Sequence, residues 1–183
     1  MCIRDRLLHL LLIRSANSSA LALSKVISGS EAAFVEKMNQ KAAELKMKDT
    51  HFINCHGLPI IQTDEQNMST LVDLNILVNK LLDDFPEILE ITKLKEYTIE
   101  RLNLKTVSTN PLLGTGSVDG LKTGTTTKAG RCLIATTTED MSGLDGKRRV
   151  ISYVFGAAND KERGIVSLGL LNYALDNLSL IHI

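Results

Sequence analysis

The chain has 183 residues, which is enough for one domain with a sizeable core. Lys and Arg together number 21 and Asp and Glu together number 21, so the formal net charge is zero, which argues against a nucleic-acid-binding protein. The hydrophobic content of 44% is ordinary for a globular protein and argues against a disordered chain.

The first predicted element is an apolar helix that leads into a polar tripeptide. The run at residues 7–13 is far too short to span a membrane, so we expect a buried helix, although the basic start also resembles a signal peptide. Ser15 and Asn17 follow, and a second helical pattern begins at once. Considered alone, these two residues favour a helix cap. Their side chains would point the same way only if the backbone were irregular there.

Two amphipathic helices are predicted next. Ser30 is expected to cap the first, whose apolar positions repeat at helical spacing up to Leu45. Ser69 or Thr70 begins the second, which ends before Pro86. These helices predict that the first half of the chain is mainly helical.

Candidate metal ligands are few and scattered. His51 and His56 lie in the loop between these helices, but no third ligand has a recognisable spacing to them, which favours structural roles. The three cysteines, Cys2, Cys55 and Cys132, show no paired spacing that would indicate a disulfide framework or a zinc site. We therefore expect neither a metal nor another cofactor.

The second half of the sequence predicts a sheet. Weak strand patterns around Asn103 indicate a small surface hairpin. Stronger strand patterns follow, and a turn at residues 143–147 predicts that the last two are antiparallel neighbours, with the basic run 147–149 as a solvated tip. Helices followed by such a sheet indicate an α+β fold. We expect strands at about 118–125, 131–138 and 149–156 and a closing helix over 163–177.

One strand pattern carries a cation, a hydroxyl and a glycine in succession, at Lys122, Thr123 and Gly124. A strand edge that offers an ammonium, a hydroxyl and backbone N–H groups suits a ligand with a carboxylate and an amide. Glycine lets such a ligand come close. A chance occurrence with a solvated lysine is the simpler interpretation of this tripeptide alone. A phosphate-binding loop is disfavoured because Leu121 separates the nearest glycine from Lys122.

The two polar motifs are more specific together than apart. Ser15-x-Asn17, followed 105 positions later by Lys122-Thr123-Gly124, resembles the penicillin-binding, active-site-serine superfamily. Within it, the sequence resembles the low-molecular-weight D-alanyl-D-alanine carboxypeptidases over roughly residues 7–176. Stretches that share this resemblance lie at 28–39, 50–58, 109–113 and 118–130.

One motif of that family has no counterpart here. The family's Ser-x-x-Lys carries the nucleophile and its lysine base and should precede Ser15 by some tens of residues, but no Ser-x-x-Lys occurs in the 183 residues. The resemblance therefore implies a partial fold of the β-lactamase/transpeptidase type. It comprises a helical subdomain, antiparallel strands and a C-terminal covering helix. The expected division is a mainly helical part at 7–95 and a sheet part with the last helix at 96–176, with 1–6 and 178–183 as non-native ends.

The resemblance implies catalytic roles for Ser15, Asn17 and Lys122. Ser15 would relay a proton toward the leaving amine. Asn17 would hydrogen-bond the substrate's amide carbonyl and help to hold the lysine base. Lys122 would supply positive potential for the terminal carboxylate of D-Ala-D-Ala.

It also implies that Thr123, Gly124 and Thr125 bind substrate. Thr123 would hydrogen-bond the same carboxylate, and Gly124 would allow close approach. The backbone N–H of Thr125 would form half of an oxyanion hole, with the other half at the nucleophile.

The implied function is a serine-type carboxypeptidase that trims D-Ala from peptidoglycan stem peptides through an acyl-enzyme, with β-lactams as inhibitors. It would act in the bacterial cell envelope, with membrane association through segments that this sequence lacks. Two alternatives remain. The chain could be a non-catalytic module that binds peptidoglycan peptide or β-lactam, which suits a sequence without the nucleophile. It could also be a class A-like β-lactamase, which would need a further carboxylate for deacylation.

Overall fold

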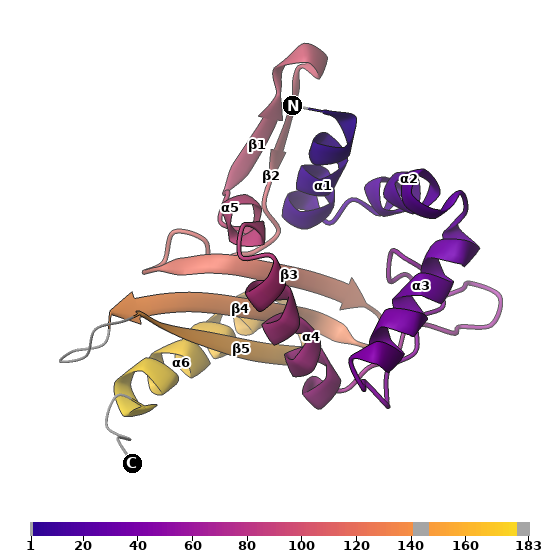
Figure 1. Cartoon of the computed structure of the whole chain (residues 1–183). Helices are drawn as coiled ribbons and strands as arrows, with labels where there is room; N and C mark the ends of the chain where they lie inside the picture. Colours follow the sequence, from indigo (N-terminus) through magenta and orange to yellow (C-terminus); the bar gives the residue numbers. More distant parts are fainter. Residues whose placement is uncertain (1, 141–146, 179–183) are drawn as a thin grey trace. The chain divides into compact units, whose positions relative to one another are not determined.

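The structure is a computed structural model that describes residues 2–140 and 147–178. Helices come first along the chain, strands follow, and a final helix closes it, which is the predicted α+β order (Figure 1). A 3-10 helix (Glu100–Leu102) joins the first two strands. The elements are α1 (Ile3–Arg14), α2 (Asn17–Ser28), α3 (Glu31–Glu44), α4 (Leu71–Asp84), α5 (Ile88–Thr92), β1 (Glu96–Ile99), β2 (Leu104–Val107), β3 (Val118–Thr126), β4 (Gly130–Asp140), β5 (Lys147–Ala157) and α6 (Asp160–Leu178).

The chain forms two compact units. Unit 1 takes in the residues up to 12 and residues 16–88, and unit 2 takes in residues 13–15 and the chain from residue 89 onward. The chain thus contributes three residues to unit 2, runs through all of α2 to α4 in unit 1, and then returns to unit 2. Ser15 is therefore a member of the sheet unit, although its neighbours in sequence are helical.

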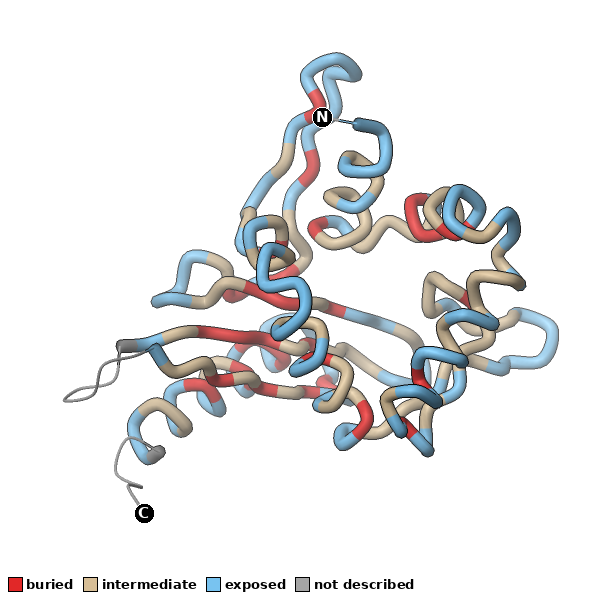
Figure 2. The backbone as a smooth tube through the Cα atoms, in the orientation of Figure 1, coloured by how far each residue is buried: buried red, intermediate tan, exposed pale blue. Residues whose placement is uncertain are grey.

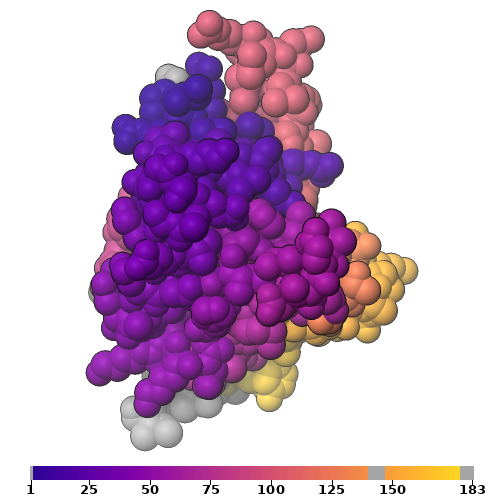
Figure 3. Space-filling view, turned by 90° about the vertical axis from the view of Figure 1, so that its right-hand side faces the viewer, coloured from indigo at the N-terminus to yellow at the C-terminus, as the bar shows by residue number. Residues whose placement is uncertain are grey.

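Unit 1 is built on helices whose ends follow the predicted caps. The Ser30 hydroxyl accepts a hydrogen bond from the backbone N–H of Ala33 at 3.1 Å, and the Thr70 hydroxyl accepts one from that of Asp73 at 3.2 Å. The buried Asp73 carboxylate in turn accepts from the hydroxyl of Thr50 at 2.7 Å, which binds the loop after α3 to the start of α4. Figure 3 shows the helices of this unit, in indigo to purple, as a closely packed surface.

Two expectations for the start of the chain are wrong. The helix at residues 7–13 exists as part of α1, but it is not a buried helix, because Ile13 alone among its described residues is fully buried and Leu8 is 38% exposed. A run of consecutive apolar residues points all round a helix, so one covered side cannot bury it. The cap interpretation of Ser15 and Asn17 also fails, because the residue before α2 is Ala16 and no side chain caps that helix.

Unit 2 is built on a sheet in which, within the described residues, β3, β4 and β5 lie side by side and antiparallel, as predicted. The helix α6 covers one face, where Leu133, Ala135 and Val150 of the strands meet Leu171 of the helix. Buried segments appear in red along the strands and α6 in Figure 2. Burial of this apolar surface is what holds the helix on the sheet.

The helix α6 begins three residues earlier than the predicted start at 163. The side chain of Asn159 accepts a hydrogen bond from the backbone N–H of Glu162 at 2.9 Å, so Asn159 acts as the cap that sequence inspection overlooked. This earlier start places Arg163 on the first turn of the helix, where its side chain is almost fully buried.

The basic run at 147–149 is part of β5, and not every residue of it is solvated as predicted. Arg149 makes two 2.9 Å hydrogen bonds to the carboxylate of Asp119 on β3 and a 2.7 Å hydrogen bond to Thr136 on β4. These contacts join the three strands on one face. Residues 143–146 of the turn predicted at 143–147 lie outside the described residues, as do positions 179–183 of the predicted non-native end.

The predicted surface hairpin is present as β1 and β2, which pair antiparallel from Glu96–Val107 to Ile99–Leu104. Asn103 closes it in the left-handed conformation, with φ of 47°. Asparagine tolerates this region better than most residues, which explains the turn. Within the described parts of the chain, no helix is both long and apolar enough to cross a membrane.

Candidate active site

The candidate site is built around a sharp turn at Ser15. The helix α1 ends at Arg14 and α2 begins at Asn17, and Ser15 between them has φ of 60°. This left-handed conformation is an irregular backbone of the kind expected if Ser15 is a site residue and not a helix cap. The backbone N–H of Thr109 donates to the carbonyl of Ile13 at 3.1 Å, so the turn is held by the loop that precedes β3.

Lys122 meets Ser15 directly. The ammonium of Lys122 donates to the Ser15 hydroxyl at 2.6 Å and to the carbonyl of Thr123 at 2.7 Å. Both residues belong to unit 2, and both are half-buried. A hydroxyl that accepts from an ammonium keeps its own proton free to donate, so this pair can pass a proton outward.

The Lys122 ammonium is largely buried and lies near a second cation, Arg163. Burial, and after it the charge of Arg163, lowers the pKa of Lys122 to about 8. Arg163 is 4% exposed, and its guanidinium donates to the carbonyls of Cys132 and Thr109, each at 3.3 Å. Its Nε is buried without a hydrogen-bond partner among the described residues, although Asp160 pairs with the far end of the guanidinium at 2.9 Å. Two cations and one unused donor are suited to an anionic ligand.

Sequence analysis missed Arg163 as a site residue. It assigned this residue to the start of the closing helix, and no motif distinguishes a buried arginine from the exposed basic residues around it. Only the packing of α6 on the sheet brings the guanidinium near Lys122. Thr109 was noticed only as part of a family-like stretch, and its contacts with the site were not foreseen.

The remaining predicted binding residues follow Lys122 along β3. Thr123 is 7% exposed, and its hydroxyl is 2.5 Å from that of Thr109. Gly124 and Thr125 are exposed. A Cβ on Gly124 would meet only the Cβ of Cys132, at 3.9 Å, so internal packing does not require glycine here. The open backbone at Gly124 is therefore available to an external group.

Asn17 is the first residue of α2 and belongs to unit 1. Of the predicted site residues, unit 2 holds Ser15 and the run from Lys122 to Thr125. Within this set, a hydrogen bond between two side chains joins Ser15 and Lys122.

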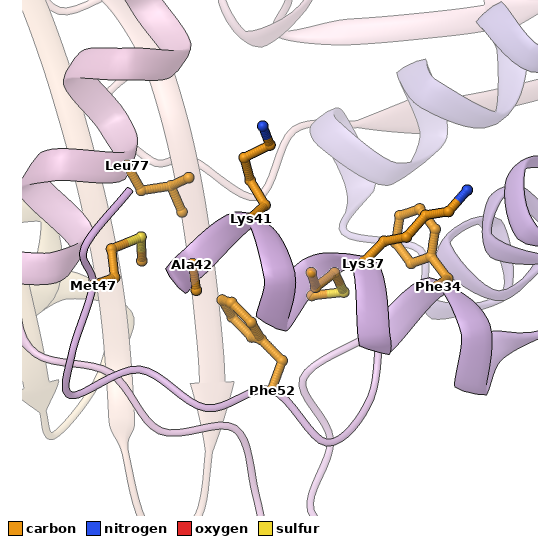
Figure 4. A pocket seen from close by; sticks show the side chains of 8 residues that line it. Phe34, Lys37, Lys41, Ala42, Met47, Phe52 and Leu77 are labelled. Atoms are coloured by element: carbon orange, nitrogen blue, oxygen red, sulfur yellow. The ribbon is translucent and has the colours of Figure 1, made fainter. Parts of the chain in front are cut away.

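Two cavities in unit 1 are lined by none of these residues. One, of 310 Å³, lies between α3, α4 and the loop after α3 (Figure 4). Its walls include Phe34, Met47, Phe52 and Leu77, and its ionisable lining residues are the exposed Lys37 and Lys41. The other, of 520 Å³, is lined by residues that include Asn39, Lys46 and His51. Neither cavity has the chemistry of the Ser15–Lys122 pair.

The loop of unit 1 also holds a small polar cluster. The Glu31 carboxylate accepts hydrogen bonds from the backbone N–H and the thiol of Cys55, at 3.2 and 3.3 Å, and lies 3.7 Å from the His56 ring. Burial and the neighbouring Glu31 raise the pKa of the Cys55 thiol, which is the opposite of activation. Within the described residues, no group of three His, Cys, Asp or Glu side chains could hold a metal ion.

The fold matches solved structures of penicillin-binding proteins. Penicillin-binding protein D2 from Listeria monocytogenes, in its ampicillin-bound form, is 34% identical with a TM-score of 0.82, over 94% of this chain and 67% of that one. A peptidoglycan synthesis regulatory factor from Streptococcus pneumoniae is 33% identical with a TM-score of 0.83, over 94% of this chain and 50% of that one. The fold is thus that of the penicillin-binding transpeptidases and carboxypeptidases, as the sequence predicted.

The family follows from the sequence comparisons. Residues 2–159 match the model of the D-alanyl-D-alanine carboxypeptidase family, peptidase S11. D-alanyl-D-alanine carboxypeptidase DacF of Bacillus subtilis is 39% identical over 88% of this chain and 40% of its own length. DacD of Escherichia coli is 35% identical over 94% of this chain and 42% of its own length. The chain belongs to the D-alanyl-D-alanine carboxypeptidase family, and it spans about two-fifths of the length of these curated relatives.

Proposed function

We propose that unit 2 recognises the D-Ala-D-Ala end of a peptidoglycan stem peptide and contributes part of a serine-type carboxypeptidase site. The hydrogen bond between Lys122 and Ser15 carries this proposal, because it joins the two motifs that the family uses at one place. The terminal carboxylate binds beside Lys122 and Thr123, and the buried Arg163 adds to the positive potential there. An ammonium, a hydroxyl and a guanidinium form a strong carboxylate site.

The same proposal assigns the chemical steps. Ser15 accepts from Lys122 and donates its proton toward the leaving amine, which must be protonated as the amide bond breaks. The backbone N–H of Thr125 stabilises the oxyanion, and Gly124 leaves room for the substrate backbone.

Acylation also needs a nucleophile and its base, and the 183 residues contain no Ser-x-x-Lys. Nucleophile, base and oxyanion donors act as a unit, so the loss of one removes most of the rate. We therefore propose that the chain as given binds the peptide without cleaving it, and that cleavage requires a polypeptide that also supplies Ser-x-x-Lys.

The proposed partners and location follow from the relatives. β-Lactams carry a carboxylate, and the Listeria protein binds ampicillin and cefotaxime, so we propose that β-lactams occupy the same place here without forming a covalent bond. The proposed location is the bacterial cell envelope, where the peptide substrate is found. A β-lactamase is less well supported, because the contacts described for Lys122 include no carboxylate.

The proposal is tested by calorimetric titration of the chain with an N-acetyl tripeptide ending in D-Ala-D-Ala. The same peptide with a C-terminal amide lacks the anion and should bind about tenfold to a hundredfold more weakly, which is the usual worth of a charge-assisted hydrogen bond. The variant Lys122→Met should reduce that difference. Equal binding of acid and amide by the unaltered chain would refute the proposal.

A fluorescent penicillin tests the absence of acylation. We expect no labelled band after denaturing electrophoresis of the 183-residue chain, and labelling once a Ser-x-x-Lys segment of a relative is joined to it. A labelled band from the chain alone would show that another residue attacks.

A further inference from the structure

Thr109 contacts three parts of the candidate site at once. Its backbone N–H donates to the carbonyl of Ile13 at 3.1 Å, two residues before Ser15. Its own carbonyl accepts from the guanidinium of Arg163 at 3.3 Å. Its hydroxyl lies 2.5 Å from the hydroxyl of Thr123. The loop that carries Thr109 is therefore bonded to the Ser15 turn, to the buried cation and to the carboxylate-binding strand.

The neighbouring residue fixes this loop on β3. The side-chain amide of Asn110, which is 9% exposed, donates to the carbonyl of Gly120 at 2.9 Å. Its carbonyl oxygen accepts from the backbone N–H of Leu112 at 3.0 Å. With the loop held on both sides, and with a β-branched side chain that restricts χ1, the Thr109 hydroxyl has little freedom to turn away from Thr123.

The protons of the hydroxyl pair can be assigned by comparing the possible acceptors. The Thr109 hydroxyl has one proton and two acceptors within reach. One is the Ile13 carbonyl at 3.5 Å, which already accepts the Thr109 N–H, and the other is the Thr123 hydroxyl at 2.5 Å. Either hydroxyl could donate in the 2.5 Å contact, but a carboxylate bound at Thr123 takes the Thr123 proton and leaves the Thr109 proton for that contact. Thr123 then accepts from Thr109 and donates its own proton to the carboxylate.

From this assignment we infer that Thr109 is a positioning residue, which makes Thr123 a hydrogen-bond donor toward the ligand carboxylate. If the direction were reversed, Thr123 would donate its proton to Thr109. It would then present only lone pairs to the ligand carboxylate, and these would repel the anion. The inference rests on the proposed function, because it takes the carboxylate at Thr123 as given. Thr109 needs no contact with the ligand for this role.

The test compares acid and amide forms of the N-acetyl D-Ala-D-Ala tripeptide on single variants of the chain. Thr109→Val keeps the shape of the side chain and both backbone contacts but removes the hydroxyl. It should weaken binding of the acid peptide about tenfold and leave binding of the amide peptide unchanged. Thr109→Ser restores the hydroxyl and should restore the ratio of acid-peptide to amide-peptide affinity, here called the acid-to-amide ratio. Thr92→Val is the matched control, because Thr92 is a buried threonine whose hydroxyl bonds elsewhere, to the carbonyl of Asp119.

If Thr109 had only a structural role, Thr109→Val would change the stability of the fold and not the acid-to-amide ratio. Both Thr109→Val and Thr92→Val should lower the unfolding midpoint, since each removes a partly buried hydroxyl hydrogen bond, but Thr109→Val alone should change the acid-to-amide ratio. If Thr109→Val does not fold, Thr109→Cys, which keeps a small side chain and only a weak donor, replaces it. The double variant Thr109→Val with Thr123→Val should lose no more of the ratio than Thr123→Val alone.

The outcomes separate the two proposals. If the unaltered chain binds acid and amide peptides equally, the proposed function fails, and this inference fails with it. If the unaltered chain discriminates and Thr109→Val discriminates equally well, the proposed function stands and the inference is overturned. Loss of the ratio in Thr109→Ser as well as in Thr109→Val would also overturn it, because the hydroxyl would then not be the group that matters.

Discussion

The ammonium of Lys122 and the hydroxyl of Ser15 form a 2.6 Å hydrogen bond across 107 positions of sequence. Neither residue alone distinguishes this chain from many others, because a lysine after a turn is commonly solvated and a serine before a helix is commonly a cap. Their contact makes the chemistry specific: a cation of lowered pKa donates to a hydroxyl that has its own proton to give.

The first prediction concerns pH. The pKa of Lys122 is lowered to about 8, so the free chain loses this charge above that pH. Affinity for the acid peptide should be flat below about pH 7 and should fall by up to tenfold per pH unit above about pH 8, because the site must regain a proton to bind the anion. Calorimetric titrations from pH 6 to pH 10 would show this.

The control for the pH experiment is Lys122→Arg, whose charge persists through the whole range. Any carboxylate affinity that it retains should be insensitive to pH between 7 and 10. A flat profile for the unaltered chain would contradict the role of the Lys122 charge.

The second prediction concerns the ion pair between Arg149 and Asp119. Each removal of one partner, as Arg149→Met or Asp119→Asn, should lower the free energy of unfolding by about 1–3 kcal/mol, because one guanidinium nitrogen contacts both carboxylate oxygens at a place largely shielded from solvent. Urea unfolding of both variants and of the double variant measures the coupling. Additive effects of the two substitutions would show that the pair contributes little, as is usual for exposed pairs.

The third prediction compares two glycines. Gly130 has φ of 66°, and a Cβ there would lie 2.8 Å from the Cα of Gly156, so Gly130→Ala should destabilise the chain by about 1–3 kcal/mol. Gly169 lies within α6 with nothing near its missing Cβ, so Gly169→Ala should stabilise by up to about 1 kcal/mol. Thermal unfolding of the two variants should therefore shift in opposite directions.

The fourth prediction compares neighbouring leucines of α6. Leu171 is 1% exposed in the core between helix and sheet, whereas Leu170 is 45% exposed. Leu171→Ala should cost about 2–5 kcal/mol and Leu170→Ala less than about 1 kcal/mol, because only the first leaves a cavity. Similar losses for both would mean that α6 does not cover the sheet as described.

Local features were predictable from sequence. Ser30 and Thr70 cap their helices as expected, because capping depends on a side chain and a backbone N–H three residues away. The strands of the sheet also lie within a few residues of their predicted bounds, since alternation and turn residues are visible in the sequence. The hairpin around Asn103 follows for the same reason.

Features that depend on distant contacts were not predictable. Nothing near Arg163 in sequence shows that its guanidinium will be buried beside Lys122, because the burial arises when α6 packs on the sheet. The contact between Thr109 and Thr123 likewise exists only because the intervening chain folds back on itself. The sequence showed that an irregular backbone would be needed at Ser15 but not whether it was present, since helix caps and left-handed turns use the same residue types.

The separation of residues 13–15 from the rest of unit 2 in sequence limits how the chain can be shortened. A polypeptide trimmed to begin at Leu89 would keep every strand of the sheet yet lose the Ile13 carbonyl, which would leave the Thr109 N–H without its acceptor and Lys122 without Ser15. Engineering a minimal peptide sensor from this protein would thus require grafting the tripeptide back, for example through a circularly permuted chain.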